Sequence, residues 1–154
     1  MLARGFILAA IVVGVVAPAV GDQPAMPGER LIAAQPEPAA FVAYYWRARP
    51  GRTAEYNDYI LKVAVPIDED ARRAGVFEEV RTVTPKPGPD GALPDWTHLR
   101  IFRLKSLGAV DQLSAGLDAA TARVVPDEAQ RKANTARSAE LRDLVRREVW
   151  TELK

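Results

Sequence analysis

His98 is the only histidine in the 154-residue chain, and its imidazole is the side chain best suited to move a proton near neutral pH. The alternating residue types of residues 96–104 predict a strand that places His98, Phe102 and Trp96 on one face. There, His98 could transfer a proton or bind a heme iron. A histidine that completes the hydrogen bonds of a core or an interface, or that faces solvent, is the more common case without a surrounding motif.

Aromatic and basic side chains could accompany His98. Tyr44, Tyr45 and Trp46 are consecutive and could form a wall for a flat ligand, although packing in a core or a dimer interface is their more frequent role. A buried strand arginine such as Arg100 could bind a carboxylate or a heme propionate, whereas an exposed one pairs with glutamates at the sheet edge. The candidate ligand-binding residues are Tyr45, Trp46, His98, Arg100 and Phe102, and His98 is the candidate catalytic residue.

Several other kinds of site are absent from the sequence. It contains no cysteine, no Gly-x-Ser-x-Gly element for a nucleophilic serine and no glycine-rich phosphate loop after a predicted strand. The acidic run Asp68-Glu69-Asp70 falls on a predicted helix, where successive side chains point in different directions. We interpret this run as a solvated face that pairs with Arg72 and Arg73, and we expect no metal site.

The strand predicted over residues 41–48 is the element that positions the aromatic side chains. Its aromatic and β-branched residues are typical of a pleated strand. Odd-numbered residues from Phe41 to Tyr45 would lie on one face, and even-numbered residues from Val42 to Trp46 on the other. Neither set is polar, whereas an antiparallel strand with one wet face alternates apolar and polar residues. We expect helices of the same chain on one face and a second copy of the chain on the other.

The next segment predicts a long amphipathic helix. Apolar residues recur at spacings of three and four from Tyr56 to Ala74. We expect Thr53 to cap this helix, Pro66 to kink it and Gly75 to end it.

The rest of the chain predicts three more strands and two more helical segments. The strands are expected over residues 76–84, 96–104 and 144–153, with Phe77 and Val83 on one face of the first and Val76 and Val80 on the other. Residues 144–153 could instead extend the preceding helix, but the alternation of β-branched and charged residues favours a strand. Residues 85–94 contain four prolines and predict an exposed hairpin loop. One helix follows Ser106 with a buried stripe, and another follows Pro126 with a capping box. The stripe is Leu107, Val110, Leu113 and Leu117, and the box is Asp127 and Gln130.

This βαββαβ order predicts an α+β, ferredoxin-like fold with a four-stranded antiparallel sheet and its helices on one face. The uncovered face would be a larger apolar patch than monomers usually expose, so we expect a two-fold homodimer to bury it.

The chain resembles the dimeric α+β barrel superfamily over residues 41–153. The resemblance rests on the aromatic strand leading through Pro50-Gly51 into Glu55-Tyr56, on the helix ending at Gly75, and on a strand entering a short helix through Lys105-Ser106-Leu107. It implies homodimers with a pocket between sheet and helices. Members include cofactor-free monooxygenases acting on aromatic polyketides, heme-degrading and heme-binding proteins, and small proteins of unknown role, so no single reaction is implied.

Residues 1–21 have the organisation of a secretory signal peptide. Arg4 precedes an apolar run, and small residues follow before Asp22. We expect cleavage after Ala19 or Gly21 and release to the periplasm or the exterior; the alternative is an uncleaved anchor, for which the run is short. A proline-rich linker over 22–40 then leads to the domain at 41–154, with no stable membrane span after cleavage.

The net charge of the chain argues against nucleic acid as a partner. Arg4 is the only charged residue before Asp22, so cleavage would take the formal net charge from +1 to 0. A neutral domain lacks the basic surface that nucleic acid requires. We predict an exported homodimer that binds a small aromatic or apolar molecule, with heme as a candidate but no obligatory cofactor. The alternatives are a cofactor-independent or heme-degrading monooxygenase of the same fold, and a module that only dimerises or binds a partner.

Overall fold

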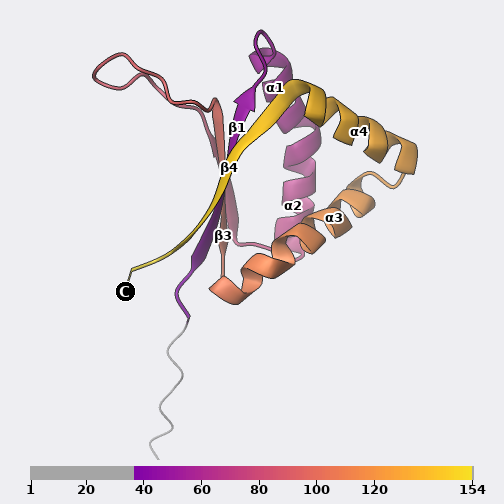
Figure 1. The fold of residues 1–154 in the computed structure, drawn as a ribbon. Helices are drawn as coiled ribbons and strands as arrows, with labels where there is room; N and C mark the ends of the chain where they lie inside the picture. The colour runs from indigo at the N-terminus through magenta and orange to yellow at the C-terminus, as the bar shows by residue number, and fades with distance from the viewer. Residues whose placement is uncertain (1–36, 154) are drawn as a thin grey trace, which may run out of the picture. The chain divides into compact units, whose positions relative to one another are not determined.

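The computed structural model describes residues 37–153, which form one sheet with helices on one side (Figure 1). The sheet has the order β2-β3-β1-β4, and all neighbouring strands are antiparallel. Its strands are β1 Ala40–Ala48, β2 Glu79–Val83, β3 His98–Leu104 and β4 Arg142–Thr151. The predicted ferredoxin-like α+β fold is confirmed. The predicted signal peptide and most of the predicted linker lie outside the described residues.

The first helical region is a helix with a widened turn in its middle. It consists of α1 Thr53–Tyr59, the π-helix η1 Ile60–Ala64 and α2 Val65–Arg73. Pro66 has no N–H to donate, and the turn before it widens so that the Val65 N–H bonds the carbonyl of Ile60, five residues back. Gly75 follows with φ of 76°, as a helix-ending glycine should.

The predicted cap of the first helix is wrong by one residue. Arg52 is the N-cap, because its carbonyl already accepts from the Tyr56 N–H at 2.9 Å, and Thr53 is the first helical residue. At the other end of the chain, the Asp127 side chain does cap α4 (Glu128–Leu141), accepting from the Gln130 N–H at 2.7 Å. The Gln130 side chain bonds Asn134 instead of completing the predicted box.

The segment after Ser106 begins as the 3-10 helix η2 Leu107–Gln112 and continues as α3 Leu113–Val124. This tighter first turn shifts the positions that face the core, and the prediction that Leu107 is buried is wrong: it is 55% exposed. Leu113 is buried, and Val110 and Leu117 pack against the core as predicted. The Ser106 side chain makes no capping hydrogen bond to the described part of the chain.

The core lies between the helices and one face of the sheet, which we call the helix-covered face. Val42 of β1 and Phe102 and Leu104 of β3 are buried there, as the period-two pattern predicts. Phe77 and Val76 join the same cluster because β2 begins only at Glu79, so the prediction that they lie on opposite faces is wrong. Among the described helices, none is long and apolar enough to cross a lipid bilayer.

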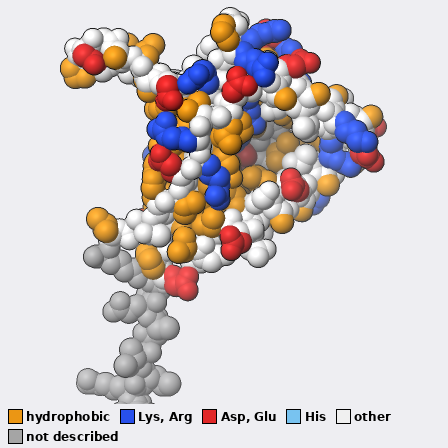
Figure 2. Space-filling model, in the orientation of Figure 1, with side chains coloured by type: hydrophobic (Ala, Val, Ile, Leu, Met, Phe, Trp, Pro, Cys, Tyr) orange, Lys and Arg blue, Asp and Glu red, His pale blue; other side chains and the backbone are white. Residues whose placement is uncertain are grey.

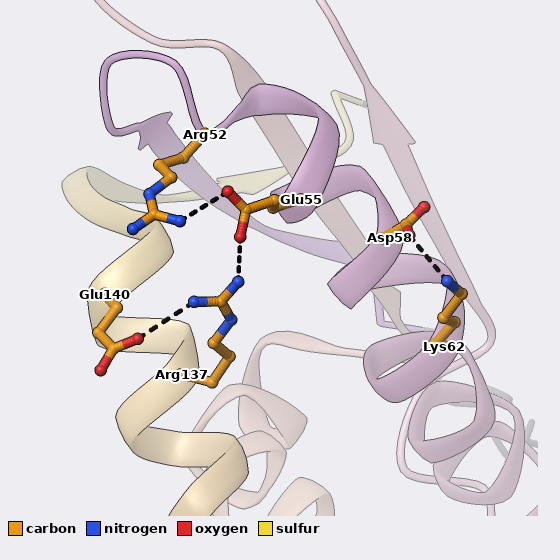
Figure 3. A network of polar contacts seen from close by, with 6 residues as sticks. All are labelled: Arg52, Glu55, Asp58, Lys62, Arg137 and Glu140. Atoms are coloured by element: carbon orange, nitrogen blue, oxygen red, sulfur yellow. Dashed lines mark hydrogen bonds and ion pairs between the residues drawn. The ribbon is translucent and has the colours of Figure 1, made fainter.

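A polar network ties α1 to α4 at the surface of the helical layer (Figure 3). Glu55 of α1 accepts from Arg52 at 2.6 Å and also from Arg137 of α4, and Arg137 bonds Glu140 at 3.2 Å. Each pair is partly exposed, so the network orients the two helices more than it stabilises them.

Candidate functional site

The structure brings four of the five predicted ligand-binding residues to the helix-covered face. Trp46 of β1 lies directly across from His98 of β3, and Arg100 and Phe102 follow on the same face of β3. Tyr45 lies on the opposite face, which we call the outer face, where its hydroxyl donates to Glu148 at 3.1 Å. Burial and Glu148 raise the pKa of this phenol.

His98 is enclosed and held at both ring nitrogens. The residue is 1% exposed, Nε2 lies 2.7 Å from Asn57 Oδ1, and Nδ1 lies 2.8 Å from Thr97 Oγ1. Thr97 Oγ1 accepts from the Ala48 N–H at 2.7 Å and can donate its own proton to Nδ1. We therefore assign the tautomer with the proton on Nε2, donated to Asn57.

Burial lowers the pKa of His98, and the nearby Arg142 guanidinium lowers it further. His98 is consequently neutral at pH 7. Its geometry does not fit an axial heme ligand, because iron needs a free nitrogen lone pair, whereas Nε2 carries the proton donated to Asn57 and Nδ1 accepts from Thr97. Among the described residues, no three metal-ligating side chains come together.

A second buried group surrounds Tyr56, which is 0% exposed. Its ring packs edge-on against His98 with centroids 4.5 Å apart, and its hydroxyl accepts from Arg142 at 2.7 Å. The Arg142 guanidinium also stacks on the Trp46 indole at 3.5 Å and donates to Ser138 at 2.9 Å. Burial raises the pKa of Tyr56 while Arg142 opposes the rise. These contacts fix the rings on either side of His98.

Arg100 and Asp68 form an ion pair beneath α2 that the sequence reasoning missed. Both residues are buried, so the interpretation of Asp68 as part of a solvated face is wrong. Burial raises the pKa of Asp68, and Arg100 opposes the rise. Asp70 does form the expected kind of exposed pair, with Arg73 at 3.8 Å and Arg123 at 2.6 Å. Arg100 Nε has no hydrogen-bond partner within the described residues.

An open cleft runs between the first helical region and the edge strand β2, and we call it the β2 cleft. It comprises two hollows of about 560 and 290 Å³ that share Ile60, Leu61 and Thr82. The smaller hollow reaches His98 and Asn57, and the larger continues past Val65 to Asp68. The helical wall therefore combines three apolar side chains of η1 and α2 near His98 with charged side chains of α2 at the far end.

Asn57, Tyr56, Arg142 and Asp68 were not among the predicted site residues. Asn57 is 41 positions from His98 in sequence, and Asp68 is 32 positions from Arg100. No local pattern indicates such pairs. A buried arginine on a strand does indicate that some carboxylate must reach it, which is the one signal available for Asp68.

No protein-family model and no curated protein sequence matches the chain. The chain is similar to the solved structure of HapK from Hahella chejuensis, with a TM-score of 0.50 and 8% identity over 74% of this chain and 92% of that one. It is also similar to an EthD-like protein from Ralstonia eutropha JMP134, with a TM-score of 0.49 and 11% identity over 74% of this chain and 91% of that one. A third similar structure is an ethyl tert-butyl ether D (EthD) family protein from Bacillus halodurans C-125, with a TM-score of 0.45 and 12% identity over 75% of this chain and 99% of that one. At such identities, similarity establishes the fold and no activity. The described residues thus have the fold of the dimeric α+β barrel proteins, a four-stranded antiparallel sheet with its helices on one face.

Proposed function

We propose that this protein is an exported homodimer that binds a small molecule in the β2 cleft, between the sheet and the first helical region. The observation that carries the proposal is the position of His98 at one end of a cleft that is lined partly by apolar side chains. Ligand sites commonly combine apolar side chains with a few placed polar groups, and the hollow at His98 does so, with Ile60 and Leu61 beside Asn57, Thr82 and Thr84.

The polar end of the cleft indicates what the ligand must offer. His98 Nε2 donates to Asn57, an exposed residue that lines the same hollow. A ligand oxygen could take the place of the Asn57 carbonyl and accept the same proton without leaving His98 unpaired. Ile60, Leu61 and Val65 would cover the rest of the ligand. The favoured ligand is therefore a small aromatic or apolar molecule with a carbonyl or phenolic oxygen.

The widened turn η1 also supports the β2 cleft as the location of the ligand site. Its residues Ile60 and Leu61 line both hollows of the β2 cleft. Short π-helical insertions within α-helices are frequent at functional sites, because they change which side chains face a cleft. Leu61 is 65% exposed although it is a large apolar side chain, which fits a wall that a ligand completes.

The homodimer is proposed from the outer face of the sheet. Phe41, Leu99 and Ile101 lie on this face, and beside them Val83 is 42% exposed and Trp150 is 40% exposed. No helix in the described part of the chain covers them (Figure 1). A second copy stacked on this face would bury the apolar side chains of both subunits.

Export is proposed from the signal-peptide pattern of residues 1–21. An intact mass that corresponds to a mature chain starting at Val20 or Asp22 would support it.

The cleft can be tested with one aromatic probe and a matched pair of variants. We expect 1,8-dihydroxyanthraquinone, a flat molecule with carbonyl and phenolic oxygens, to bind and quench tryptophan fluorescence. Leu61→Glu should weaken this binding at least tenfold, because it places a charge in the apolar wall. Leu107→Glu changes another exposed leucine, which does not line the cleft, and should leave binding unchanged. Equal affinity for both variants, or no binding by the wild type, would contradict the proposed site.

A cofactor-independent monooxygenase of this fold is the second candidate, favoured by the neutral, buried His98 at the cleft. An anthrone such as 1,8-dihydroxyanthrone would be the test substrate, since one O₂ converts it to the anthraquinone and one water. Oxygen uptake above the spontaneous rate that is lost in Leu61→Glu would establish this activity, and uptake at the spontaneous rate would exclude it for that substrate. A heme-degrading activity is disfavoured because both ring nitrogens of His98, the only histidine, are already hydrogen-bonded, so we expect no Soret shift on heme titration.

A further inference from the structure

The connection between β2 and β3 is longer than a hairpin turn requires. Residues 84–97, which we call the β2–β3 arm, stand clear of the body on the side of the sheet away from the helices (Figures 1 and 2). Side chains 86–95 are all exposed, including Leu93 at 62%. Long loops in compact domains are usually functional or disordered, which makes the internal order of this arm informative.

The arm is organised by its own hydrogen bonds. The Gly88 N–H donates to the Ala92 carbonyl at 3.0 Å, and the Gly91 N–H donates to the Gly88 carbonyl at 2.9 Å. The Asp90 side chain accepts from the Ala92 N–H at 3.0 Å. Prolines on both sides of this turn restrict the backbone further. A preorganised arm loses little conformational freedom when it binds.

The base of the arm is fixed to the outer face. The Asp95 carboxylate pairs with Arg47 of β1 at 3.6 Å and with Arg146 of β4 at 3.4 Å, and its carbonyl accepts from Arg47 Nε at 2.5 Å. The Trp96 ring packs edge-on against Tyr45 with centroids 5.6 Å apart, which also corrects the prediction that Trp96 shares a face with His98. The arm is therefore anchored to the face that the proposed dimer buries.

The outer face offers a receiving surface for the arm of a second copy. An apolar hollow of about 430 Å³ is lined by Phe41, Ile101 and Trp150. The two edges of this face each carry one arginine and one glutamate: Arg81 and Glu79 on β2, and Arg146 and Glu148 on β4. A two-fold axis in the interface and perpendicular to the strands reverses the strand direction, so the end of one sheet that carries the arm meets the end of the partner's sheet that holds the hollow. Each edge then faces the same edge of the partner in the opposite direction, and an arginine of one subunit can meet a glutamate of the other.

We propose that the β2–β3 arm of each subunit clasps the partner, with the apolar segment at Leu93, next to the turn at its tip, packed on the partner's outer face. This inference rests on the proposed homodimer and names the element that secures it. The apolar segment Ala92-Leu93-Pro94 then loses its contact with water, and the hollow beside Trp150 receives side chains from outside its own chain.

Cross-linking between chains tests the clasp. The chain has no cysteine, so Leu93→Cys gives a unique attachment point for a benzophenone maleimide. Mixed ¹⁴N and ¹⁵N chains should yield cross-linked peptides that join a labelled arm of one isotope to β1, β3 or β4 of the other. In sedimentation, Leu93→Asp should raise the dimer Kd at least tenfold, whereas Leu61→Asp on the helical side should not.

The outcomes separate the two proposals. Heavy–light cross-links together with the weakened Leu93→Asp dimer support the clasp. A wild-type dimer that shows only same-chain cross-links and an unchanged Kd for Leu93→Asp overturns the clasp and leaves the dimer intact. A wild-type protein that is monomeric at every concentration overturns the homodimer, and the clasp with it.

Discussion

At His98, burial and two hydrogen bonds determine the chemistry that the imidazole can perform. The ring donates from Nε2 to Asn57 and accepts at Nδ1, so it becomes a neutral donor toward the β2 cleft once Asn57 moves away. A neutral histidine suits ligand binding through a hydrogen bond, and it can accept a proton only if Thr97 turns its hydroxyl elsewhere. The same burial makes the residue a reporter of folding.

We expect stability to depend on pH through His98. Its folded pKa is lowered below the ordinary value of 6.5, mainly by burial, so the unfolded chain takes up a proton first as pH falls. The free energy of unfolding should therefore decline below about pH 6.5, by at most about 1.4 kcal/mol per pH unit for one group. Urea unfolding between pH 8 and 5 measures the slope.

The matched variant for that measurement is His98→Gln, which can keep a hydrogen bond to Asn57 but cannot take up a proton. The difference between the two proteins isolates His98 from the carboxylates, including Asp68, whose pKa is shifted the other way by burial. Parallel slopes for wild type and His98→Gln would show that His98 is exposed to water or paired in a way that the structure does not have.

At the level of elements, α3 packs closely on the segment that leads into β2. A Cβ on Gly116 would lie 2.4 Å from Val76 Cγ1 and 2.7 Å from its Cγ2, and Val76 is stiff and packed against the core. Gly116→Ala should thus cost about 1–3 kcal/mol from overpacking, more than the roughly 1 kcal/mol that alanine contributes to helix propensity.

Gly108→Ala is the control, because the nearest atom to its added Cβ is Ser106 Oγ at 3.8 Å. Thermal unfolding of the two variants should show a lower melting temperature for Gly116→Ala alone, partly restored by Val76→Ala. A stabilised Gly116→Ala protein would mean that α3 stands farther from Val76 than described.

The strands were predictable because the residue types within each strand are enough to indicate it. Aromatic and β-branched residues, and the alternation of His98, Arg100 and Phe102 with their neighbours, indicate strands and faces without tertiary context. Period two also places the adjacent residues Tyr45 and Trp46 on opposite faces, so a single pocket cannot take both side chains within one subunit.

Other features depend on packing and were not predictable. Pro66 removes a backbone donor, but whether the chain kinks or widens its turn depends on how the helix meets β2, and here it widens as η1. The Asn57–His98 and Asp68–Arg100 pairs join residues far apart in sequence. The length of the β2–β3 arm was visible in sequence, but its anchoring on Arg47 and Arg146 was not.

At the scale of the whole molecule, the central strand β1 is apolar on both faces of the sheet, and the helices cover only one face. The core cluster around Val42 and Phe102 fills the helix-covered side. On the outer side, the hollow beside Ile101 and Trp150 is lined by side chains that would be buried if a second subunit packed there. The proposed homodimer and the clasp both depend on this asymmetry, whereas the β2 cleft lies within one subunit.

Sedimentation equilibrium of the purified protein tests most directly whether a second copy of the chain buries the outer face. We predict twice the chain mass at micromolar concentration, a monomer for Ile101→Asp in the centre of the outer face, and a dimer for Leu107→Asp, whose leucine is 55% exposed on η2. Circular dichroism would confirm that both variants fold. A wild-type chain that stays monomeric as its concentration rises, or an Ile101→Asp protein as dimeric as the wild type, would contradict burial of the outer face by a second copy.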